Sequence, residues 1–445
     1  MIRRVWLPRR PYVVVFLGAS AASLLQAQDL TTLYQFCTQF SAKAACTDGA
    51  YPTGIVLGTD GNFYGMTDEG GVHGVGTVFK ITLSGALTTL YTFCSQAGCT
   101  DGQYPLGGLV EGTDGNFYGT TQYGGGTGCD YGCGTVFKIT PSGTLTTLYR
   151  FCSESGCADG AEPAAGLVQA SDGYFYGTTA GGGINNTNVC FPPSAASGCG
   201  TVFKITPTGK LTTLYTFCSQ SGCTDGGSPY AGLVRTTDGD FIGTTQDGGT
   251  AYSFGGTIFK ITPSGTLTTL HSFCALTACA DGQDPAGGLV RTANGDIYGT
   301  TVGGGVNFGG TVFKLASSGA LTTLYSFCAQ ADCTDGYVPA AGLIRASNGN
   351  FFGTTDRGGS AGVNGYAGGT VFKITPSGKL TTLYRLHCDR EGICPHGQGP
   401  GGLLQLTDGN FYGTTGAGGA SGLGTLFSLS LGLGPLVETQ AGFGK

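Results

Sequence analysis

Residues 107–121 read Gly107-Gly-Leu-Val-Glu-Gly-Thr-Asp-Gly-Asn-Phe-Tyr-Gly-Thr-Thr121, and variants of this stretch occur seven times along the chain. It is followed by Gly134-Thr-Val-Phe-Lys-Ile-Thr-Pro-Ser-Gly143 and by Leu145-Thr-Thr-Leu-Tyr-Arg-Phe151. The apolar runs are rich in Val, Ile, Thr, Tyr and Phe, which suit the half-buried surface of a sheet. Beyond the N-terminal leader, the sequence lacks the 3.6-residue period of an amphipathic helix. Each unit therefore predicts four antiparallel strands.

Turn residues separate the apolar runs. Asp114-Gly115 lies between the first two runs, and we expect a two-residue type I′ hairpin turn there, with positive φ at both residues. Pro141-Ser-Gly143 separates the last two runs, where proline presets φ and glycine can adopt the left-handed conformation. The first turn recurs at Asp60-Gly61, Asp172-Gly173, Asp238-Gly239, Asn294-Gly295, Asn348-Gly349 and Asp408-Gly409.

The spacing and order of the units predict a closed ring. Four-stranded repeats of this kind are typical of propeller blades, whereas a parallel β-helix, the weaker alternative, needs shorter coils. The chain opens with a single strand at 30–36 and closes with three strands at 402–429. We predict an all-β, seven-bladed β-propeller with four antiparallel strands per blade, closed because the N-terminal strand completes the last blade. The units begin near Leu30, Leu87, Leu145, Leu211, Leu267, Leu321 and Leu380.

The N-terminus differs from the repeats. Four arginines precede an apolar stretch at 12–25, and small residues lead to a cleavage site after Ala27, which predicts a signal peptide. The predicted organisation is a signal peptide at 1–27, the propeller at 28–431 and a tail at 432–445. Loss of the four arginines changes the formal charge from −6 to −10, which disfavours nucleic acid and anionic lipid as partners. We expect a monomer with no membrane span after signal cleavage.

The 18 cysteines fall into nine local pairs. An even number in an exported chain favours disulfides. Zinc is the weaker alternative, because a site needs four ligands and no histidine recurs beside the pairs. The predicted disulfides are Cys37–Cys46, Cys94–Cys99, Cys129–Cys133, Cys152–Cys157, Cys190–Cys199, Cys218–Cys223, Cys274–Cys279, Cys328–Cys333 and Cys388–Cys394.

The repeated segments resemble a known family. Gly-Leu-Val-x-x-x-Asp-Gly-Asn-Phe-Tyr-Gly-Thr-Thr, with Gly-Thr-Val-Phe-Lys-Ile-Thr-Pro-Ser-Gly and Leu-Thr-Thr-Leu-Tyr-x-Phe, is similar to the GloVer tandem repeat of bacterial choice-of-anchor proteins, from about Leu30 to Leu431. The resemblance implies an exported, cell-surface, propeller-like protein and supplies no catalytic residues. The tail after Leu431 resembles the segment that leads into an immunoglobulin-like domain in longer relatives, but lacks an anchor. We expect this copy to be truncated or freely secreted.

Strand alternation places the variable loops together. The loops between the second and third strands, and those between blades, share one face of the ring, and all length variation falls there. Variable loops on a rigid scaffold are where binding sites concentrate. A ring of carboxylates in these loops could collect Ca²⁺ or a polyol, although as turn residues they could instead bind their own backbone amides. These residues are Asp48, Asp101, Asp159, Asp225, Asp281 and Asp335.

Two further groups of residues are candidates for ligand binding. Arg235, Arg291 and Arg345 occupy the same first-strand position in successive units. They could hold a carboxylate or sulfate in the channel, or pair with neighbouring blades. The last disulfide loop departs from the repeat, which suits a one-off site, although terminal repeats are commonly atypical. Its candidate residues are His387, Asp389, Arg390, Glu391 and His396.

The functional prediction is an exported, non-enzymatic propeller that serves as an extracellular binding, adhesion or surface-display module, with a glycan or envelope component as partner. The alternative is a propeller enzyme, either a glycan hydrolase or lyase or a metal-dependent lactonase, acting on the variable-loop face or in the axial channel. That alternative rests on fold analogy. We assign no catalytic residues and no resident metal, and Ca²⁺ is the one cofactor considered.

Overall fold

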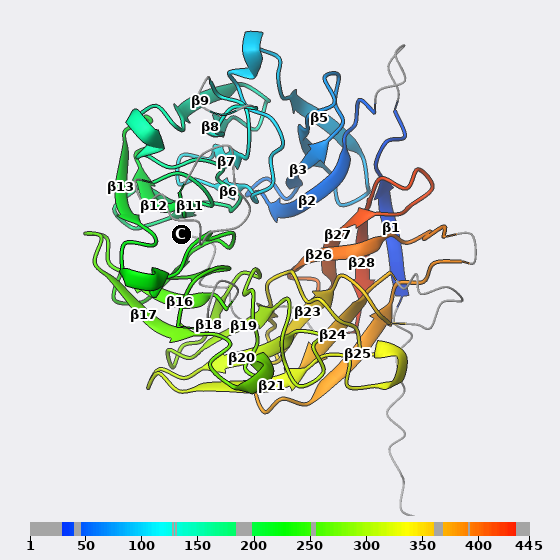
Figure 1. Cartoon of the computed structure of the whole chain (residues 1–445). Coiled ribbons are helices and arrows are strands. Elements are labelled where there is room, and N and C mark those ends of the chain that lie inside the picture. The colour runs from blue at the N-terminus through cyan, green and yellow to red at the C-terminus, as the bar shows by residue number, and fades with distance from the viewer. Residues whose placement is uncertain are drawn as a thin grey trace, which may run out of the picture.

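The computed structural model describes residues 29–39, 46–126, 129, 131–183, 198–250, 255–359, 368–389 and 392–432. They form seven four-stranded antiparallel sheets arranged around a central axis (Figure 1). The predicted seven-bladed propeller is therefore confirmed. The predicted signal peptide lies outside the described residues, as does the predicted tail beyond residue 432.

Each blade runs outward from the axis in chain order, and the last blade takes its outer strand from the N-terminus. Blade 1 contains β2 (Ala50–Leu57), β3 (Phe63–Glu69), β4 (Thr77–Ile81) and β5 (Leu87–Thr92). Blade 2 contains β6 (Val110–Glu111), β7 (Phe117–Thr121), β8 (Thr135–Ile139) and β9 (Leu145–Arg150). Blade 3 contains β10 (Val168–Gln169), β11 (Phe175–Thr179), β12 (Thr201–Ile205) and β13 (Leu211–Thr216). Blade 4 contains β14 (Val234–Arg235), β15 (Phe241–Thr245), β16 (Thr257–Ile261) and β17 (Leu267–Ser272).

The remaining blades follow the same order. Blade 5 contains β18 (Val290–Arg291), β19 (Ile297–Thr301), β20 (Thr311–Leu315) and β21 (Leu321–Ser326). Blade 6 contains β22 (Ile344–Arg345), β23 (Phe351–Thr355), β24 (Thr370–Ile374) and β25 (Leu380–Arg385). Blade 7 contains β26 (Gln398–Gln405), β27 (Phe411–Ala417), β28 (Thr425–Ser430) and β1 (Asp29–Gln35).

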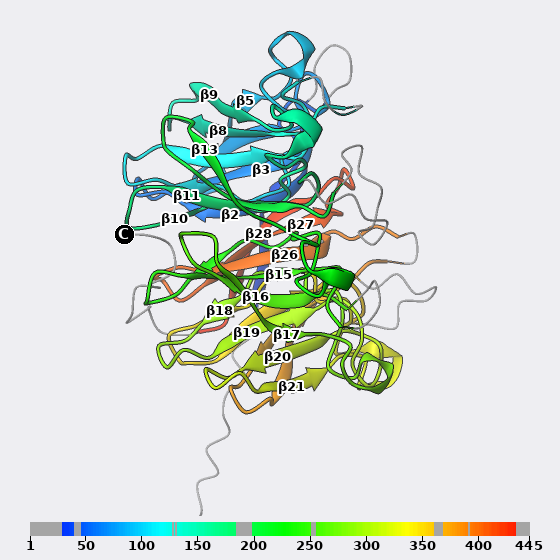
Figure 2. The same ribbon diagram turned by 60° about the vertical axis from the view of Figure 1, so that its left-hand side comes forward.

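One-turn 3-10 helices follow the outermost strands and project on one side of the disc (Figure 2). None of the helices in the described ranges is long and apolar enough to cross a membrane. The helices are η1 (Ala97–Cys99), η2 (Ser155–Cys157), η3 (Ser221–Cys223), η4 (Thr277–Cys279) and η5 (Ala331–Cys333).

Aromatic side chains hold the blades against one another. Tyr118 of β7 stacks on Phe175 of β11 in the next blade, with ring centroids 4.0 Å apart, and both rings are buried. Further out, Phe151, which follows β9, packs edge-on against Phe203 of β12 at 5.2 Å. Aromatic pairs of this geometry contribute about 0.5–1.5 kcal/mol beyond their burial. Because the unit is repeated, similar contacts recur between other blades, and the core runs around the ring.

The N-terminal strand closes this ring. β1 pairs with β28 in antiparallel register, with Leu30 opposite Leu429 (Figure 1). The N–H of Phe36 donates to the carbonyl of Gly424 at 3.0 Å, and the N–H of Tyr51 donates to that of Leu423 at 2.8 Å. Strands from the two ends of the chain thus share one sheet, and blade 7 has no unpaired outer edge.

The first turn of each unit differs from its prediction. Gly115 has a φ of 74°, but Asp114 is not among the residues with positive φ, so the turn is not type I′. The N–H of Gly115 donates to the carbonyl of Gly112, and the N–H of Gly112 donates to that of Asn116. This pattern is a type I turn followed by a left-handed glycine in a bulge. The Asp114 carboxylate accepts from the N–H of Asn116 at 3.1 Å, which stabilises this longer turn. The second turn has the expected left-handed glycine, with a φ of 94° at Gly143.

Disulfides cross-link loops between the blades and, at Cys129–Cys133, a loop within blade 2. Eight of the nine predicted pairs are bonded within the described residues, while Cys190 of the ninth lies outside them. Several small loops place both cysteines in the left-handed region, for example Cys94 with a φ of 61° and Cys99 with a φ of 51°. Disulfides are common in exported proteins and rare in most cytosolic ones, so these bonds fit an extracellular protein.

Candidate functional site at the mouth of the axial cavity

A cavity of about 480 Å³ lies on the propeller axis, where the segments that precede the innermost strands meet. Its wall consists mostly of Gly and Ala, and Tyr230 is its largest side chain. Glycine is required at Gly107, because a Cβ atom there would lie 2.6 Å from the main chain of Ala165 in the next blade. The main chains of neighbouring blades approach closely here, so the positions admit only small residues. Because these residues have little or no side chain, the space on the axis stays unfilled. The volume falls within the range of roughly 300–1,000 Å³ that is typical of small-molecule sites.

Among the described residues, two ionisable side chains line the cavity: that of Asp356, which follows β23, and that of Tyr230, which follows Pro229. The residues that precede the prolines of these segments surround them. The residue before proline is left-handed even where it is not glycine, as at Glu162 with a φ of 58°. Its N–H donates to the carbonyl of Cys133 in the preceding blade at 2.8 Å, and its carbonyl accepts from Ala180 at 3.0 Å. Such a conformation is uncommon, most of all before proline. Strained backbone conformations that the surrounding structure holds in place occur at many functional sites.

Two carboxyl groups on the same face of the ring, those of Asp68 and Asp284, are poorly stabilised as anions. Asp68 lies near the end of β3, and burial, with a smaller contribution from the Glu69 charge, raises its pKa to about 6. Asp284 precedes a proline, and burial raises its pKa to about 6 as well. The hydrogen bond from Gln283 opposes this shift, while the charge of Asp247 adds to it. Carboxyl groups with pKa values near neutrality are common at binding and catalytic sites.

Tyrosines connect these carboxylates into one group. Burial raises the pKa of Tyr230 to about 12, and the charges of Glu162 and Asp247 add to the shift. Burial also raises the pKa of Tyr123, with further contributions from Glu162 and Asp68. Glu162 is 5% exposed and Asp247 is 4% exposed. Ionisable side chains from the first five blades therefore form one electrostatically coupled group, which reaches the cavity at Tyr230.

A row of aromatic rings extends this group toward solvent. The rings of Tyr104 and Tyr123 are 6.0 Å apart and nearly perpendicular, and Tyr131 lies 6.3 Å beyond Tyr123. The Nε2 of Gln103 donates to the carbonyl of Tyr131 at 2.7 Å. Tyr131 is 70% exposed, so its ring is open to a ligand. The arrangement offers apolar ring faces beside hydrogen-bond acceptors, which is the combination that polyhydroxylated ligands require.

Replacing Asp284 by asparagine is expected to stabilise the protein at neutral pH. The folded-state pKa lies above the unfolded value, so ionisation disfavours the folded state, and stability falls as pH rises through about 6. We expect Asp284→Asn to raise the free energy of unfolding by about 1 kcal/mol at pH 7.5, after allowance for solvent screening, with no gain at pH 3.5. Urea unfolding at the two pH values measures this. The exposed Asp332→Asn variant is the control and should show no gain at either pH.

The predicted carboxylate ring has a structural role. Asp159 is fully buried, and its Oδ2 accepts from the hydroxyl of Tyr149 at 2.8 Å and from the N–H of Ser153 at 2.9 Å. Its Oδ1 accepts from the N–H of Glu154 at 3.2 Å. Each carboxylate thus binds its own disulfide loop to the tyrosine of the outermost strand. In blade 4, His271 replaces that tyrosine and lies 3.4 Å from its Asp.

The three candidate arginines lie at the ends of β14, β18 and β22, away from the cavity mouth. The Nη2 of Arg235 donates to the hydroxyl of Ser171 at 2.6 Å, and that of Arg291 donates to the hydroxyl of Thr237 at 3.1 Å. These hydroxyls belong to the first turn of the preceding blade. The two arginines therefore link neighbouring blades, and Arg345 holds the same position at the end of β22. None of the three lines the cavity within the described part of the chain.

The last disulfide loop contains the other predicted candidate residues. His387 is exposed, and the Oδ1 of Asp389 accepts from the N–H of Ile393 at 2.9 Å within the loop's own turn. Arg390 and Glu391 lie outside the described residues. The loop thus gains a local turn from Asp389.

His396 stands where the other loops have their buried aspartate. Its Nδ1 lies 3.3 Å from the hydroxyl of Thr32 in β1, and its carbonyl accepts from the hydroxyl of Thr425 at 3.2 Å. Thr32 and Thr425 belong to the two strands that pair when the ring closes. The histidine therefore contacts both β1 and β28, the two strands whose pairing closes blade 7.

The residues of this group were not among those predicted from the sequence. Asp68, Glu162, Tyr230 and Asp284 occupy repeat positions that differ from blade to blade. The available signal was variation beside the proline of each loop and after each Thr-Thr pair. Within the described residues, clusters with metal-ligand geometry consist of cysteines, so the mouth shows no arrangement of that kind.

The fold and the repeated unit define a tandem-repeat β-propeller. The chain belongs to the Gloeobacter/Verrucomicrobia repeat family, whose model matches residues 23–191, 192–366 and 277–436. This match confirms the family resemblance in the sequence. A comparison with curated proteins gave no match.

Solved structures share the architecture at low sequence identity. A streptogramin B lyase structure aligns with a TM-score of 0.54 and 14% identity, covering 91% of this chain and 97% of the lyase. The extracellular domain of a one-component system from B. thetaiotaomicron aligns with a TM-score of 0.50 and 12% identity, covering 91% of this chain and 40% of that one. At such identities the likeness shows the fold alone.

Proposed function

We propose that the protein is an exported propeller that binds neutral glycans at the mouth of its axial cavity and does not transform them. The observation that carries this proposal is that Tyr230 and Asp356 line a cavity whose wall is mostly Gly and Ala, while the charges of Glu162 and Asp247 act on Tyr230. Export is supported by the disulfides and by the predicted signal peptide.

The chemistry of the mouth favours an uncharged polyol over an anion. Its ionisable side chains are mostly acidic, and Arg357, which lies beside it, is paired with Asp356, with Nε 3.2 Å from Oδ2. A carboxylate or sulfate group would be repelled, whereas sugar hydroxyls can donate to carboxylates. The C–H face of a sugar can pack on an aromatic ring such as that of Tyr131 or Tyr230. A neutral oligosaccharide therefore uses both kinds of group present.

The test is calorimetric titration of the mature protein with a panel of neutral and acidic oligosaccharides. Tyr230→Ala is expected to weaken binding of the neutral ligand at least tenfold, which corresponds to about 1.4 kcal/mol. Arg291→Ala, on the opposite face, is the matched control and should bind normally. Binding of acidic glycans alone, or loss of binding in the Arg291 variant with Tyr230→Ala unaffected, would contradict the proposal.

A second function has one observation in its favour. Asp68 and Asp284, with pKa values raised to about 6, are suited to donate a proton to a leaving group near neutral pH. A glycan hydrolase or lyase would use such a group. Incubating the protein with each bound oligosaccharide and analysing the products separates the two functions, since a binding module returns the ligand unchanged.

A further inference from the structure

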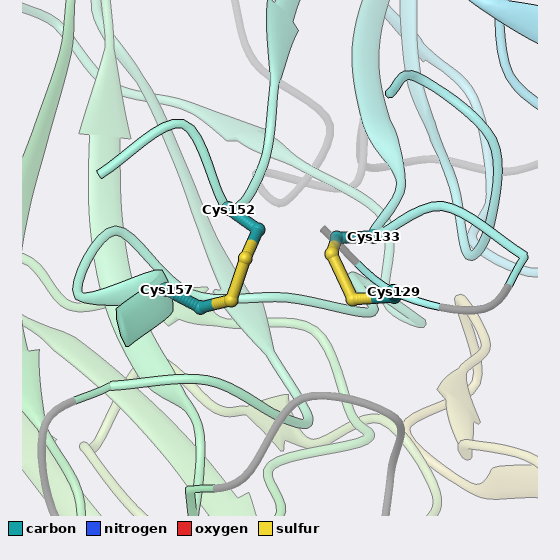
Figure 3. A group of neighbouring side chains, drawn as sticks. All are labelled: Cys129, Cys133, Cys152 and Cys157. Atoms are coloured by element: carbon teal, nitrogen blue, oxygen red, sulfur yellow. A yellow bond between two sulfur atoms is a disulfide. The ribbon is translucent and has the colours of Figure 1, made fainter. Parts of the chain in front are cut away.

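Four cysteines of blade 2 lie together on the loop face. Cys129 and Cys133 belong to the loop between β7 and β8, whereas Cys152 and Cys157 follow β9. Figure 3 shows the two disulfides side by side, and all four sulfur atoms lie within 4.8 Å of one another. Both bonds are predicted disulfides, and together they place four potential metal ligands in one cluster.

The spacing fits a tetrathiolate metal site. Zinc binds four cysteine sulfurs tetrahedrally at about 2.3 Å, which places neighbouring sulfurs about 3.8 Å apart. Sulfurs already within 4.8 Å need only small movements to reach that geometry once their covalent bonds are broken. Two of the cysteines are buried and two are partly exposed, so a reductant and a metal ion can reach the cluster.

The surrounding structure can hold the four residues in place without the disulfides. Cys133 and Cys157 are part of the apolar core between blades 2 and 3, which includes Phe151 and Phe203. The carbonyl of Cys133 also accepts from the N–H of Glu162 in the next blade. Packing and main-chain bonds therefore fix the positions of the loops from which the sulfurs project.

We propose that these four cysteines form a redox-controlled site for a soft divalent cation such as Zn²⁺. In the oxidised protein the sulfurs are consumed as two disulfides. Two equivalents of a dithiol reductant supply two electrons and two protons to each S–S bond, giving four thiols and two oxidised reductant molecules. Zn²⁺ then displaces four protons and forms four Zn–S bonds. The oxidised protein binds no zinc at this position.

Cobalt binding measures the site directly. The mature protein is reduced with a trialkylphosphine, which is converted to its oxide, freed of reductant without oxygen and titrated with Co²⁺ and then Zn²⁺. The expected result is the visible absorption of tetrahedral cobalt thiolate, its loss on zinc addition, and no such signal from oxidised protein. Cys129→Ser/Cys133→Ser is expected to bind one metal ion fewer per chain than the parent. This variant should fold, because most blades lack that pair.

The chain supplies its own control. Cys274→Ser/Cys279→Ser removes a pair from blade 4, which has no second pair in its strand-two to strand-three loop. This variant should keep the parent's metal content. Near-ultraviolet circular dichroism shows whether the reduced protein keeps its tertiary structure. Equal metal binding by the two double variants, or unfolding of the reduced parent in the presence of zinc, would overturn the proposal.

Discussion

Asp159→Ala is expected to lower the free energy of unfolding by about 3–5 kcal/mol, a cost typical of leaving buried polar partners unsatisfied. Oxygens of this buried carboxylate accept from two main-chain N–H groups and two hydroxyls. Alanine removes all four acceptor contacts and cannot replace them. One of these hydroxyls is that of Tyr149, whose pKa is raised to about 12 by burial with a contribution from this carboxylate. Guanidinium unfolding at neutral pH measures the change.

Asp172→Ala is the matched control for this substitution. Asp172 lies in the first turn of blade 3, between β10 and β11, and its side chain is exposed. Its carboxylate accepts from the N–H of Tyr174 at 3.0 Å and from the hydroxyl of Tyr176 at 2.8 Å. We expect a cost of about 1 kcal/mol or less there.

A chelator should leave the unfolding of the parent protein unchanged. If chelation destabilised the parent by as much as Asp159→Ala does, the carboxylate would be a metal ligand rather than a loop anchor.

Local patterns predicted the fold because the same unit is repeated. Runs such as 135–139 fit a strand in every copy, and the isolated strand at 30–36 could only complete the unit at 402–429. The type of the first turn was not predictable from Asp114-Gly115, because that dipeptide suits two turn types. The choice depends on the hydrogen bond that the N–H of Asn116 donates to the Asp114 carboxylate, which stabilises the longer turn.

The candidate site was less predictable because it is assembled across blades. Asp68 and Glu162 are 94 positions apart in the sequence, yet both affect the ionisation of Tyr123. Nothing in their local sequence predicts burial, and burial is what raises the pKa of Asp68. For Arg235 and Arg291 the sequence left open a ligand or a contact between blades, and both side chains bond to hydroxyls of the preceding blade.

Deletion of β1, residues 29–35, is expected to destabilise the propeller by about 5 kcal/mol or more and to cause association between chains. The deletion removes the main-chain pairing with β28, the burial of Leu30 and the bond of 2.8 Å from the hydroxyl of Tyr34 to Asp48. It also exposes the edge of β28, which can then pair with other chains. Thermal unfolding and sedimentation of the shortened protein measure the two effects.

A peptide spanning residues 29–36 should restore stability and a monomeric state to the shortened chain, because the open edge accepts a strand by the pairing that β1 normally makes. The same peptide with Leu30→Asp is the control, since it keeps the main-chain donors but places a charge in the core beside Leu429 and Phe427. Rescue by the first peptide and not by the second assigns the loss to closure of blade 7. Equal stability of the shortened and parent proteins without peptide would mean that the ring is held by the contacts between β2, β26 and β27 and that β1 is dispensable.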